Sequence, residues 1–198
     1  MTNLLELFKP GQRIFVAGSS NEPTALLAHL QDQALPEQLE FVQFPIGGYN
    51  EVDFTAWNDT ARLTTFFMTS ALRKADPARL NFLPMQMRAV YDYLAQDIDV
   101  CLVQVAFDRD GVLRLGPNVD FIDAVLANRP VIVAELNRHI TAPLGSPQIP
   151  LERLNYVFDS ERELFAMPPS SIKPPCMPRS FLAVSCDNIA AGIAPIPV

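Results

Sequence analysis

The sequence predicts an α/β domain with a mainly parallel sheet and helices on both faces. Short runs rich in Val, Ile and Phe alternate with segments of helical spacing between residues 12 and 160, which is typical of this fold class. Residues 99–105 (DVCLVQV) and 130–136 (PVIVAEL) are almost entirely apolar, as strands buried on both faces of a parallel sheet are. We therefore expect these two segments to be adjacent inner strands.

Composition sets limits on the class of protein. With 49% hydrophobic and 19% charged residues, the chain of 198 residues is expected to be globular. The formal net charge of −7 and the lack of basic clusters argue against a nucleic-acid partner. No apolar run reaches the length of about 20 residues that a membrane helix needs, and no signal-peptide pattern opens the chain. The predicted location is the cytoplasm, with no membrane contact.

Cysteine and histidine usage agrees with that location. Cys101, Cys176 and Cys186 have no metal-ligand spacing, and we expect a reduced chain with Cys101 in the core. His29 and His139 have no ligand-spaced neighbour. The sequence therefore predicts neither a metal site nor a bound cofactor.

The first part of the chain reads as a βαβ unit. A short amphipathic helix over 4–8 precedes a strand over 13–17, and a second strand is expected over 39–44. Between them, Asn21 is placed to cap a helix with Pro23 in its first turn and Leu26, Leu27 and Leu30 on its buried face. A strand–helix–strand unit of this kind implies parallel strands and a right-handed crossover.

The middle of the chain is less regular. Residues 49–62 lack a clear period and are interpreted as a loop with one helical turn. Two short strands, over 63–67 and 80–83, flank a short helix over 70–75. Met87, Val90, Tyr91 and Leu94 then repeat at helical spacing, which predicts a core-packing helix.

The stretch from 99 to 121 organises the rest of the domain. After the buried strand, Asp108-Arg109-Asp110-Gly111 reads as a turn that leads into a second extended piece over 112–115. A helix over 120–127, the strand over 130–136, a Pro/Gly-rich loop and a last strand over 155–158 complete the pattern. The domain is predicted to span residues 1–166. Residues 167–198, with five prolines between 167 and 178, are interpreted as a linker and the truncated start of a second domain.

Five segments carry a resemblance to a known family. They are RIFVAGSSNEPTALLAHL, TTFFMTSALRKA, NFLPMQMRAVYDYL, DVCLVQVAFDRDGVLRLGPNVDF and PVIVAELN. In this order and spacing they resemble the N-terminal half of the acetyl-CoA hydrolase / CoA-transferase family, which includes 4-hydroxybutyrate and succinate:acetate CoA-transferases. The resemblance covers most of residues 12–165.

The resemblance implies an activity that this sequence carries only in part. Family members are two-domain proteins that bind acyl-CoA between their halves and use a glutamate to form a glutamyl-CoA thioester. That glutamate belongs to the second half, so no catalytic residue is assigned in this sequence. Coenzyme A would be a substrate, not a cofactor. The expected partners are acyl-CoA or CoA, and either a second CoA-transferase domain or another copy of the chain.

The candidate ligand-binding residues lie in turns at the carboxyl ends of the predicted strands, where open α/β sheets bind their ligands. The turn at Gly18 is the strongest candidate, because a helix N-terminus there would offer free N–H groups to an anionic or carbonyl oxygen. The predicted CoA-binding residues are Gly18, Ser19, Asn21, Glu22, Pro23, Gly47, Gln104, Asp108, Gly111 and Asn137.

Simpler structural roles compete with these assignments. Gln104 reads either as a satisfied buried hydrogen-bonding group or as a contact to the cleft. Asp108 fits a type I turn, and Ser19 has no histidine near it in sequence to serve as a base. Glu135 is a tempting nucleophile, although strand-end glutamates more often cap or orient a neighbouring loop.

Two functions of different class therefore follow from the sequence. The first is the acyl-CoA-binding half of a CoA-transferase or acyl-CoA hydrolase. The alternative is a free-standing, non-catalytic α/β domain that binds a nucleotide-like ligand or a protein.

Overall fold

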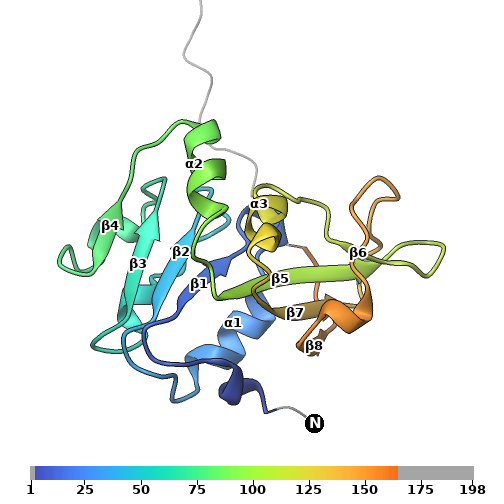
Figure 1. The fold of residues 1–198 in the computed structure, drawn as a ribbon, viewed down its shortest axis with the longest axis horizontal. Coiled ribbons are helices and arrows are strands. Elements are labelled where there is room, and N and C mark those ends of the chain that lie inside the picture. The colour runs from blue at the N-terminus through green and yellow to red at the C-terminus, as the bar shows by residue number, and fades with distance from the viewer. Residues whose placement is uncertain (1–2, 165–198) are drawn as a thin grey trace, which may run out of the picture. The chain divides into compact units, whose positions relative to one another are not determined.

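The computed structural model describes residues 3–164. Residues 165–198, which include the predicted Pro-rich tail and the proposed linker, lie outside the described residues. Figure 1 shows a twisted sheet with helices packed against it. The strands are β1 (Arg13–Val16), β2 (Glu40–Gln43), β3 (Arg62–Thr65), β4 (Leu80–Phe82), β5 (Val100–Phe107), β6 (Leu113–Leu115), β7 (Val131–Asn137) and β8 (Tyr156–Ser160).

The sheet is mainly parallel, as predicted. Its strand order is β4-β3-β2-β1-β5-β7-β8, and β6 pairs with β5 outside this path. Every pair along the path is parallel, and only β5 and β6 run antiparallel. The long apolar strands β5 and β7 are direct inner neighbours, with Val100 opposite Val131 and Val105 opposite Leu136. The two segments that define the fold in the sequence are therefore the centre of the sheet.

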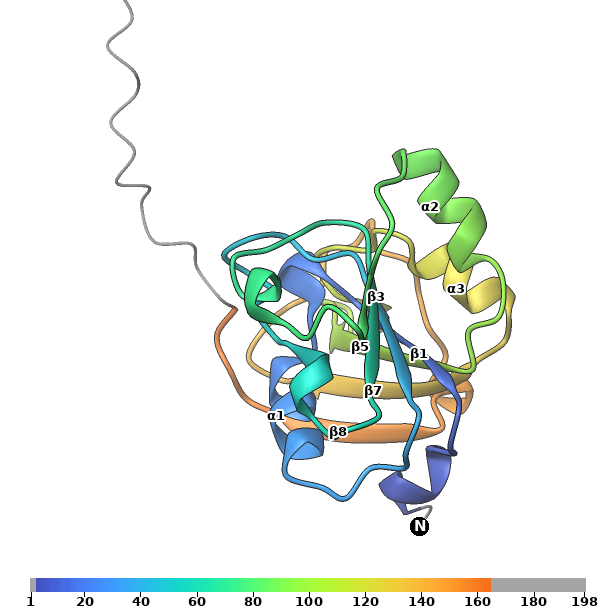
Figure 2. The ribbon, with the colours of Figure 1, turned by 90° about the vertical axis from the view of Figure 1, so that its left-hand side faces the viewer.

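Helices cover both faces of the sheet. Helix α1 (Thr24–Gln31) lies on one side, whereas α2 (Met87–Leu94) and α3 (Ile122–Ala127) lie on the other (Figure 2). The remaining helical segments are single 3-10 turns. They are η1 (Leu4–Leu7), η2 (Ser19–Asn21), η3 (Phe54–Ala56), η4 (Leu72–Lys74) and η5 (Leu151–Arg153).

Alternation along the strands divides the core into two layers. Even positions of β1, such as Ile14 and Val16, pack with Leu26 and Leu30 of α1. Odd positions such as Phe15 join the layer under α2 and α3. Cys101 belongs to this second layer, as expected, and its full burial raises the pKa of the thiol to about 12. The thiol is thus an inert core group.

Helix α2 departs from the prediction. Val90 and Leu94 are fully buried, but Met87 is 59% and Tyr91 is 41% exposed. The expectation that all four apolar residues pack in the core is wrong, because only one edge of this two-turn helix faces the sheet.

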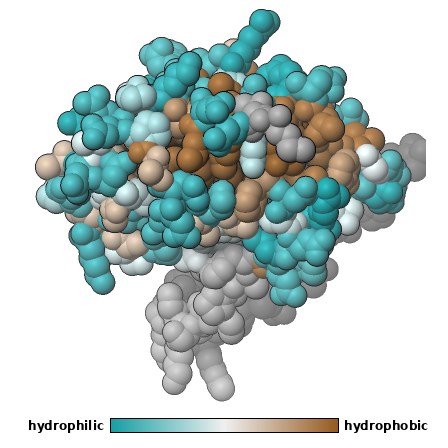
Figure 3. Space-filling view, turned by 90° about the horizontal axis from the view of Figure 1, so that it is seen from below, coloured by the Kyte–Doolittle hydropathy of each residue, from teal (hydrophilic) through white to brown (hydrophobic). Residues whose placement is uncertain are grey.

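Apolar side chains also gather on the underside of the molecule, where the described chain begins, and polar ones border them (Figure 3). No helix between residues 3 and 164 combines the length and apolar character needed to cross a bilayer.

Candidate functional site

Buried polar side chains converge at the carboxyl ends of the inner strands. They come from the turn after β1, from β2 and the loop that follows it, and from the ends of β5 and β7. Their exposed fractions are 4% or less, although they carry amides and carboxylates. The group is Asn21, Glu22, Gln43, Asn50, Gln104, Glu135 and Asn137. Because buried polar groups are almost always hydrogen-bonded, the partners of each side chain show how it is held in place.

Asn50 fixes the Gly18 turn to the turn after β2. Its Oδ1 accepts hydrogen bonds from the backbone N–H of Ser19 at 2.7 Å and of Ile46 at 2.8 Å. Its Nδ2 donates to the Ser19 carbonyl at 3.1 Å. Ser19 adopts a positive φ of 54°, which is uncommon for a residue other than glycine. The turn is therefore held in one specific conformation.

Gly18 is required by a close backbone approach. A Cβ built at this position would lie 2.2 Å from the carbonyl oxygen of Phe44. Gly47 lies in open space, with no atom within 4 Å of a built Cβ. Gly18 and Gly47 thus have different roles, since of these two only Gly18 is needed for packing.

Glu22 is a buried acid with little charge compensation. Gln43 Nε2 donates to its Oε1 at 2.8 Å. Burial raises the pKa of Glu22 to about 7, against the opposing effects of hydrogen bonds from Gln43 and Asn50 and of the nearby Arg162. The negative charge of Glu135 adds to the increase in pKa. The pKa of this carboxyl group therefore lies near neutral pH.

Glu135 is fully buried and is a hub of the cluster. Its Oε2 accepts from the backbone N–H of Leu26 in the first turn of α1 at 3.0 Å. Its Oε1 accepts from Ser160 Oγ at 2.8 Å and from Arg162 Nε at 2.7 Å. The capping and orienting role that the sequence suggested for a strand-end glutamate is what the structure shows.

This arrangement corrects two expectations about the Gly18 turn. Asn21 does not cap α1: Pro23 occupies the N-cap position, and no side chain caps the helix from there. The first turn of the helix is also not free for a ligand at Leu26, because the Glu135 carboxylate already binds that N–H group. Short-range sequence reasoning missed this partner because 109 residues separate the two positions.

Gln104 and Asn137 form the second part of the cluster. Gln104 Oε1 accepts from Arg162 Nη2 at 2.7 Å and from Asn137 Nδ2 at 3.3 Å. Asn21 Nδ2 donates to the Gln104 carbonyl at 3.3 Å. Gly116 closes this region, since a Cβ there would lie 1.8 Å from Asn21 Oδ1. Of the two interpretations of Gln104, these contacts match the satisfied buried hydrogen-bonding group.

Asp108 and Gly111 lie in the β5–β6 hairpin and not in this cluster. Asp108 Oδ1 accepts from the N–H groups of Asp110 and Val112, both at 2.9 Å, and Gly111 has a φ of 76°. Arg114 Nε donates to Asp108 Oδ2, and this hydrogen bond lowers the pKa of Asp108 below its usual range. The contacts match the turn interpretation of this motif.

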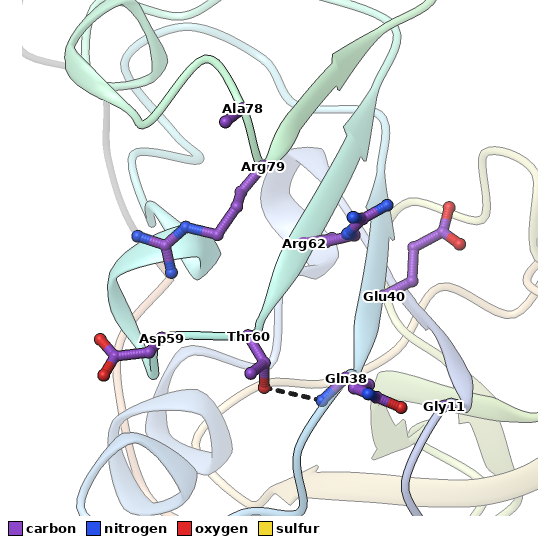
Figure 4. A pocket seen from close by; sticks show the side chains of 8 residues that line it. All are labelled: Gly11, Gln38, Glu40, Asp59, Thr60, Arg62, Ala78 and Arg79. Carbon is purple, nitrogen blue, oxygen red and sulfur yellow. Dashed lines mark hydrogen bonds between the residues drawn. The ribbon is translucent and has the colours of Figure 1, made fainter.

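A depression of about 650 Å³ lies at the opposite edge of the sheet (Figure 4). It is lined by residues at the amino ends of β2 to β4, including Glu40, Arg62 and Arg79. Arg62 and Glu40 project to one side, whereas Arg79 and Asp59 project to the other (Figure 4). Its polar groups do not converge on one point. Those at the carboxyl ends of the inner strands, here called the carboxyl edge of the sheet, do converge. We therefore place the candidate site at the carboxyl edge.

Comparison with known proteins places the chain in a family. The model of the acetyl-CoA hydrolase/transferase N-terminal domain matches residues 1–168. No curated protein sequence gives a significant match.

Solved structures share the fold at low identity. RipA from Yersinia pestis is 19% identical with a TM-score of 0.69, and the match covers 86% of this chain and 43% of that chain. The 4-hydroxybutyrate CoA-transferase from Porphyromonas gingivalis is 17% identical with a TM-score of 0.54, covering 85% and 40%. The malonate decarboxylase alpha subunit from Acinetobacter baumannii is 19% identical with a TM-score of 0.59, covering 84% and 33%. The chain thus matches less than half the length of these structures.

Proposed function

The chain belongs to the acetyl-CoA hydrolase/transferase family, and we propose that it supplies one wall of an acyl-CoA-binding cleft. The observation that carries the proposal is the convergence of the Gly18 turn, the Asn50 loop and the ends of β5 and β7 at one edge of a domain of this family. Ligands of open α/β sheets bind at this edge. In this proposal the thioester end of acyl-CoA contacts the turn at Gly18–Pro23.

The catalytic glutamate is proposed to come from a second half that is not part of this sequence. In the reaction, a carboxylate oxygen of the glutamate attacks the thioester carbonyl and the C–S bond breaks. The CoA thiolate is released, and the acyl group and the glutamate are joined in a mixed anhydride. The thiolate then attacks the glutamyl carbonyl, which releases the acyl group as a carboxylate and leaves a glutamyl-CoA thioester. The nucleophile must be ionised and free to approach the thioester.

Neither buried glutamate at the carboxyl edge meets these requirements. Glu135 is held by three donors, one of them a guanidinium. Glu22 is only 4% exposed and its carboxyl group is hydrogen-bonded to Gln43, so it is not free to approach a thioester. We therefore assign both carboxyl groups to the support of the cleft wall.

The second half is proposed to be a further domain or a partner subunit. The matched structures extend well beyond the aligned region; for RipA, the match covers only 43% of its chain. One of them is named as the alpha subunit of a larger enzyme. Both facts support a function that requires more polypeptide than residues 3–164.

Titration with CoA tests the site, with backbone amide shifts as the measurement. We expect weak binding, with shifts at Gly18–Glu22, Gly47 and Asn137, because one wall of the cleft is present. Shifts confined to Gly11, Gln38 and Arg62 at the amino edge would contradict this site. They would favour the alternative of a binding domain with its ligand at the opposite edge.

A turnover assay tests the assignment of the nucleophile. Acyl-CoA and an acceptor acid are mixed with the chain, and acyl exchange is followed by mass spectrometry. We expect no turnover by this chain alone. Turnover that Glu135→Ala abolishes would show that the nucleophile lies within this sequence.

A further inference from the structure

Arg162 connects four separate parts of the carboxyl edge. It follows β8, and its side chain reaches Glu135 at the end of β7, Gln104 in β5 and the Glu22 carbonyl in the turn after β1. The donors are Nε to Glu135 Oε1 at 2.7 Å, and Nη2 to Gln104 Oε1 and to the Glu22 carbonyl, each at 2.7 Å. The planar guanidinium has several fixed donors, so one side chain makes all three contacts.

The backbone of Arg162 is held as firmly as its side chain. Asn137 Oδ1 accepts from the Arg162 N–H at 3.3 Å, and Asn137 Nδ2 donates to the Arg162 carbonyl at 2.9 Å. This pair of hydrogen bonds mimics a strand partner beyond the end of β8. The side chain of Arg162 is 21% exposed, whereas that of Glu135 is fully buried. The guanidinium is therefore placed by its surroundings and is not a mobile surface group.

We infer that Arg162 is a positioning residue that holds the Gly18–Pro23 turn in place. One route is direct, through the Glu22 carbonyl. The other passes through Glu135, which Arg162 orients and which binds the Leu26 N–H at the start of α1. The part of this inference that concerns CoA rests on the proposed function, whereas the coupling between Arg162 and the turn does not.

The charge balance of the cluster gives the inference a second signature. The groups that face Glu22 are Arg162, Glu135, Gln43 and Asn50. Arg162 is the positive one among them and favours the ionised form of Glu22. Loss of Arg162 should therefore raise the pKa of Glu22 further, because Glu135 and burial then act without an opposing cation.

Amide hydrogen exchange on the full chain tests the positioning role. In Arg162→Gln we expect the amides of Leu26 and of Gly18–Glu22 to exchange roughly tenfold faster, since hydrogen bonds to charged groups are lost. Arg138→Gln is the matched control. Arg138 also pairs with a carboxylate near β8, Asp159 at 2.7 Å, but its side chain is 51% exposed. We expect this control to leave both sets of amides unchanged.

Arg162→Lys separates charge from geometry and serves if Arg162→Gln does not fold. Lysine keeps the charge opposite Glu135 but lacks the fork that reaches Gln104 and Glu22 together. The Gly18–Glu22 amides should then exchange faster while Leu26 stays protected. Carboxyl NMR titration should show a higher pKa for Glu22 in Arg162→Gln and not in Arg138→Gln. Unchanged exchange at Gly18–Glu22 in a folded Arg162 variant would overturn the inference.

CoA titration distinguishes failure of the inference from failure of the proposed function. If the wild-type chain binds CoA, Arg162→Lys should weaken binding roughly tenfold, and Arg138→Lys should not. If the wild-type chain does not bind CoA, the proposed function fails. The exchange experiment still decides whether Arg162 positions the turn.

Discussion

Burial and pairing give two neighbouring glutamates different properties at the carboxyl edge. Glu135 receives a guanidinium, a hydroxyl and a backbone N–H. Glu22 receives amide hydrogen bonds instead of a direct ion pair, and burial is the largest influence on its pKa. The same residue type therefore serves as a hub of hydrogen bonds at one position and as a group with a pKa near neutral at the other.

The first prediction concerns Glu22 and pH. The pKa of Glu22 is raised from 4.5 in the unfolded chain to about 7 in the native state. Between these values the unfolded state has lost the proton that the native state keeps, so rising pH favours unfolding. We expect Glu22→Gln to remove this loss of unfolding free energy, which is on the order of 3 kcal/mol at pH values above the native pKa of about 7. Denaturant unfolding at several pH values measures it.

The control for this experiment is Glu37→Gln, at an exposed position. Glutamine at position 22 keeps the shape of the side chain and an oxygen that accepts from Gln43. The two variants should differ most above pH 7 and least below pH 4.5. Parallel stability curves for Glu22→Gln and the wild type would show that Glu22 is not a perturbed acid.

A second prediction at the residue scale concerns the difference between Gly18 and Gly47. Gly18→Ala should destabilise the fold by about 1–3 kcal/mol, because the new Cβ would lie 2.2 Å from a backbone oxygen and force the end of β2 to shift. Gly47→Ala should change stability by less than about 0.5 kcal/mol, since nothing lies near its Cβ position. Chemical denaturation of both variants measures the difference. Equal effects would contradict the close approach at Gly18.

The sequence indicated several members of the cluster but not how they are connected. Asn21, Glu22, Gln104 and Asn137 were predicted from their places at strand ends. The structure brings them together with Gln43 and Asn50, which were not predicted. Arg162 was not predicted, because it follows the last short strand in a polar run, SERE, which resembles an ordinary exposed turn. Its partners lie up to 140 residues away. No local pattern records such a contact.

At the scale of elements, hydrophobic periodicity located the strands and the helices α1 to α3, whereas the short helices expected over 4–8 and 70–75 are the single 3-10 turns η1 and η4. The long apolar strands β5 and β7 are unambiguous, because only burial on both faces explains a run without polar alternation. Periodicity failed to give the depth of burial of α2. Helical spacing predicts which residues share a face, but not whether another element covers all of that face.

The third prediction tests this division within α2. Leu94→Ala should cost about 2–5 kcal/mol, because Leu94 is fully buried and its removal leaves a cavity between the helix and the sheet. Met87→Ala, in the same helix and 59% exposed, should change stability by less than about 0.5 kcal/mol. Thermal or denaturant unfolding compares the two variants. A large loss in Met87→Ala, at a protein concentration where the chain is monomeric, would mean that the chain itself covers this residue.

At the scale of the whole molecule, large apolar side chains are exposed on several elements. Phe67 is 54% and Phe82 is 44% exposed near the carboxyl ends of β3 and β4, and Met87 and Tyr91 are exposed on α2. Single exposed apolar residues are ordinary, but a group of them is typical of an interaction surface. The proposed need for a second half gives such a surface a purpose.

The last prediction is that the chain self-associates through the exposed face of α2, which carries Met87 and Tyr91. Its average mass in sedimentation equilibrium should rise with protein concentration, because the aromatic and methionine side chains leave water when two copies meet. Introducing charge with Met87→Lys and Tyr91→Lys together should lower the association constant. Leu151→Lys is the control, since Leu151 is 60% exposed but lies in η5, away from α2 in the chain. An average mass that stays at the monomer value at every concentration would contradict self-association, and equal weakening by both sets of lysines would place the contact elsewhere.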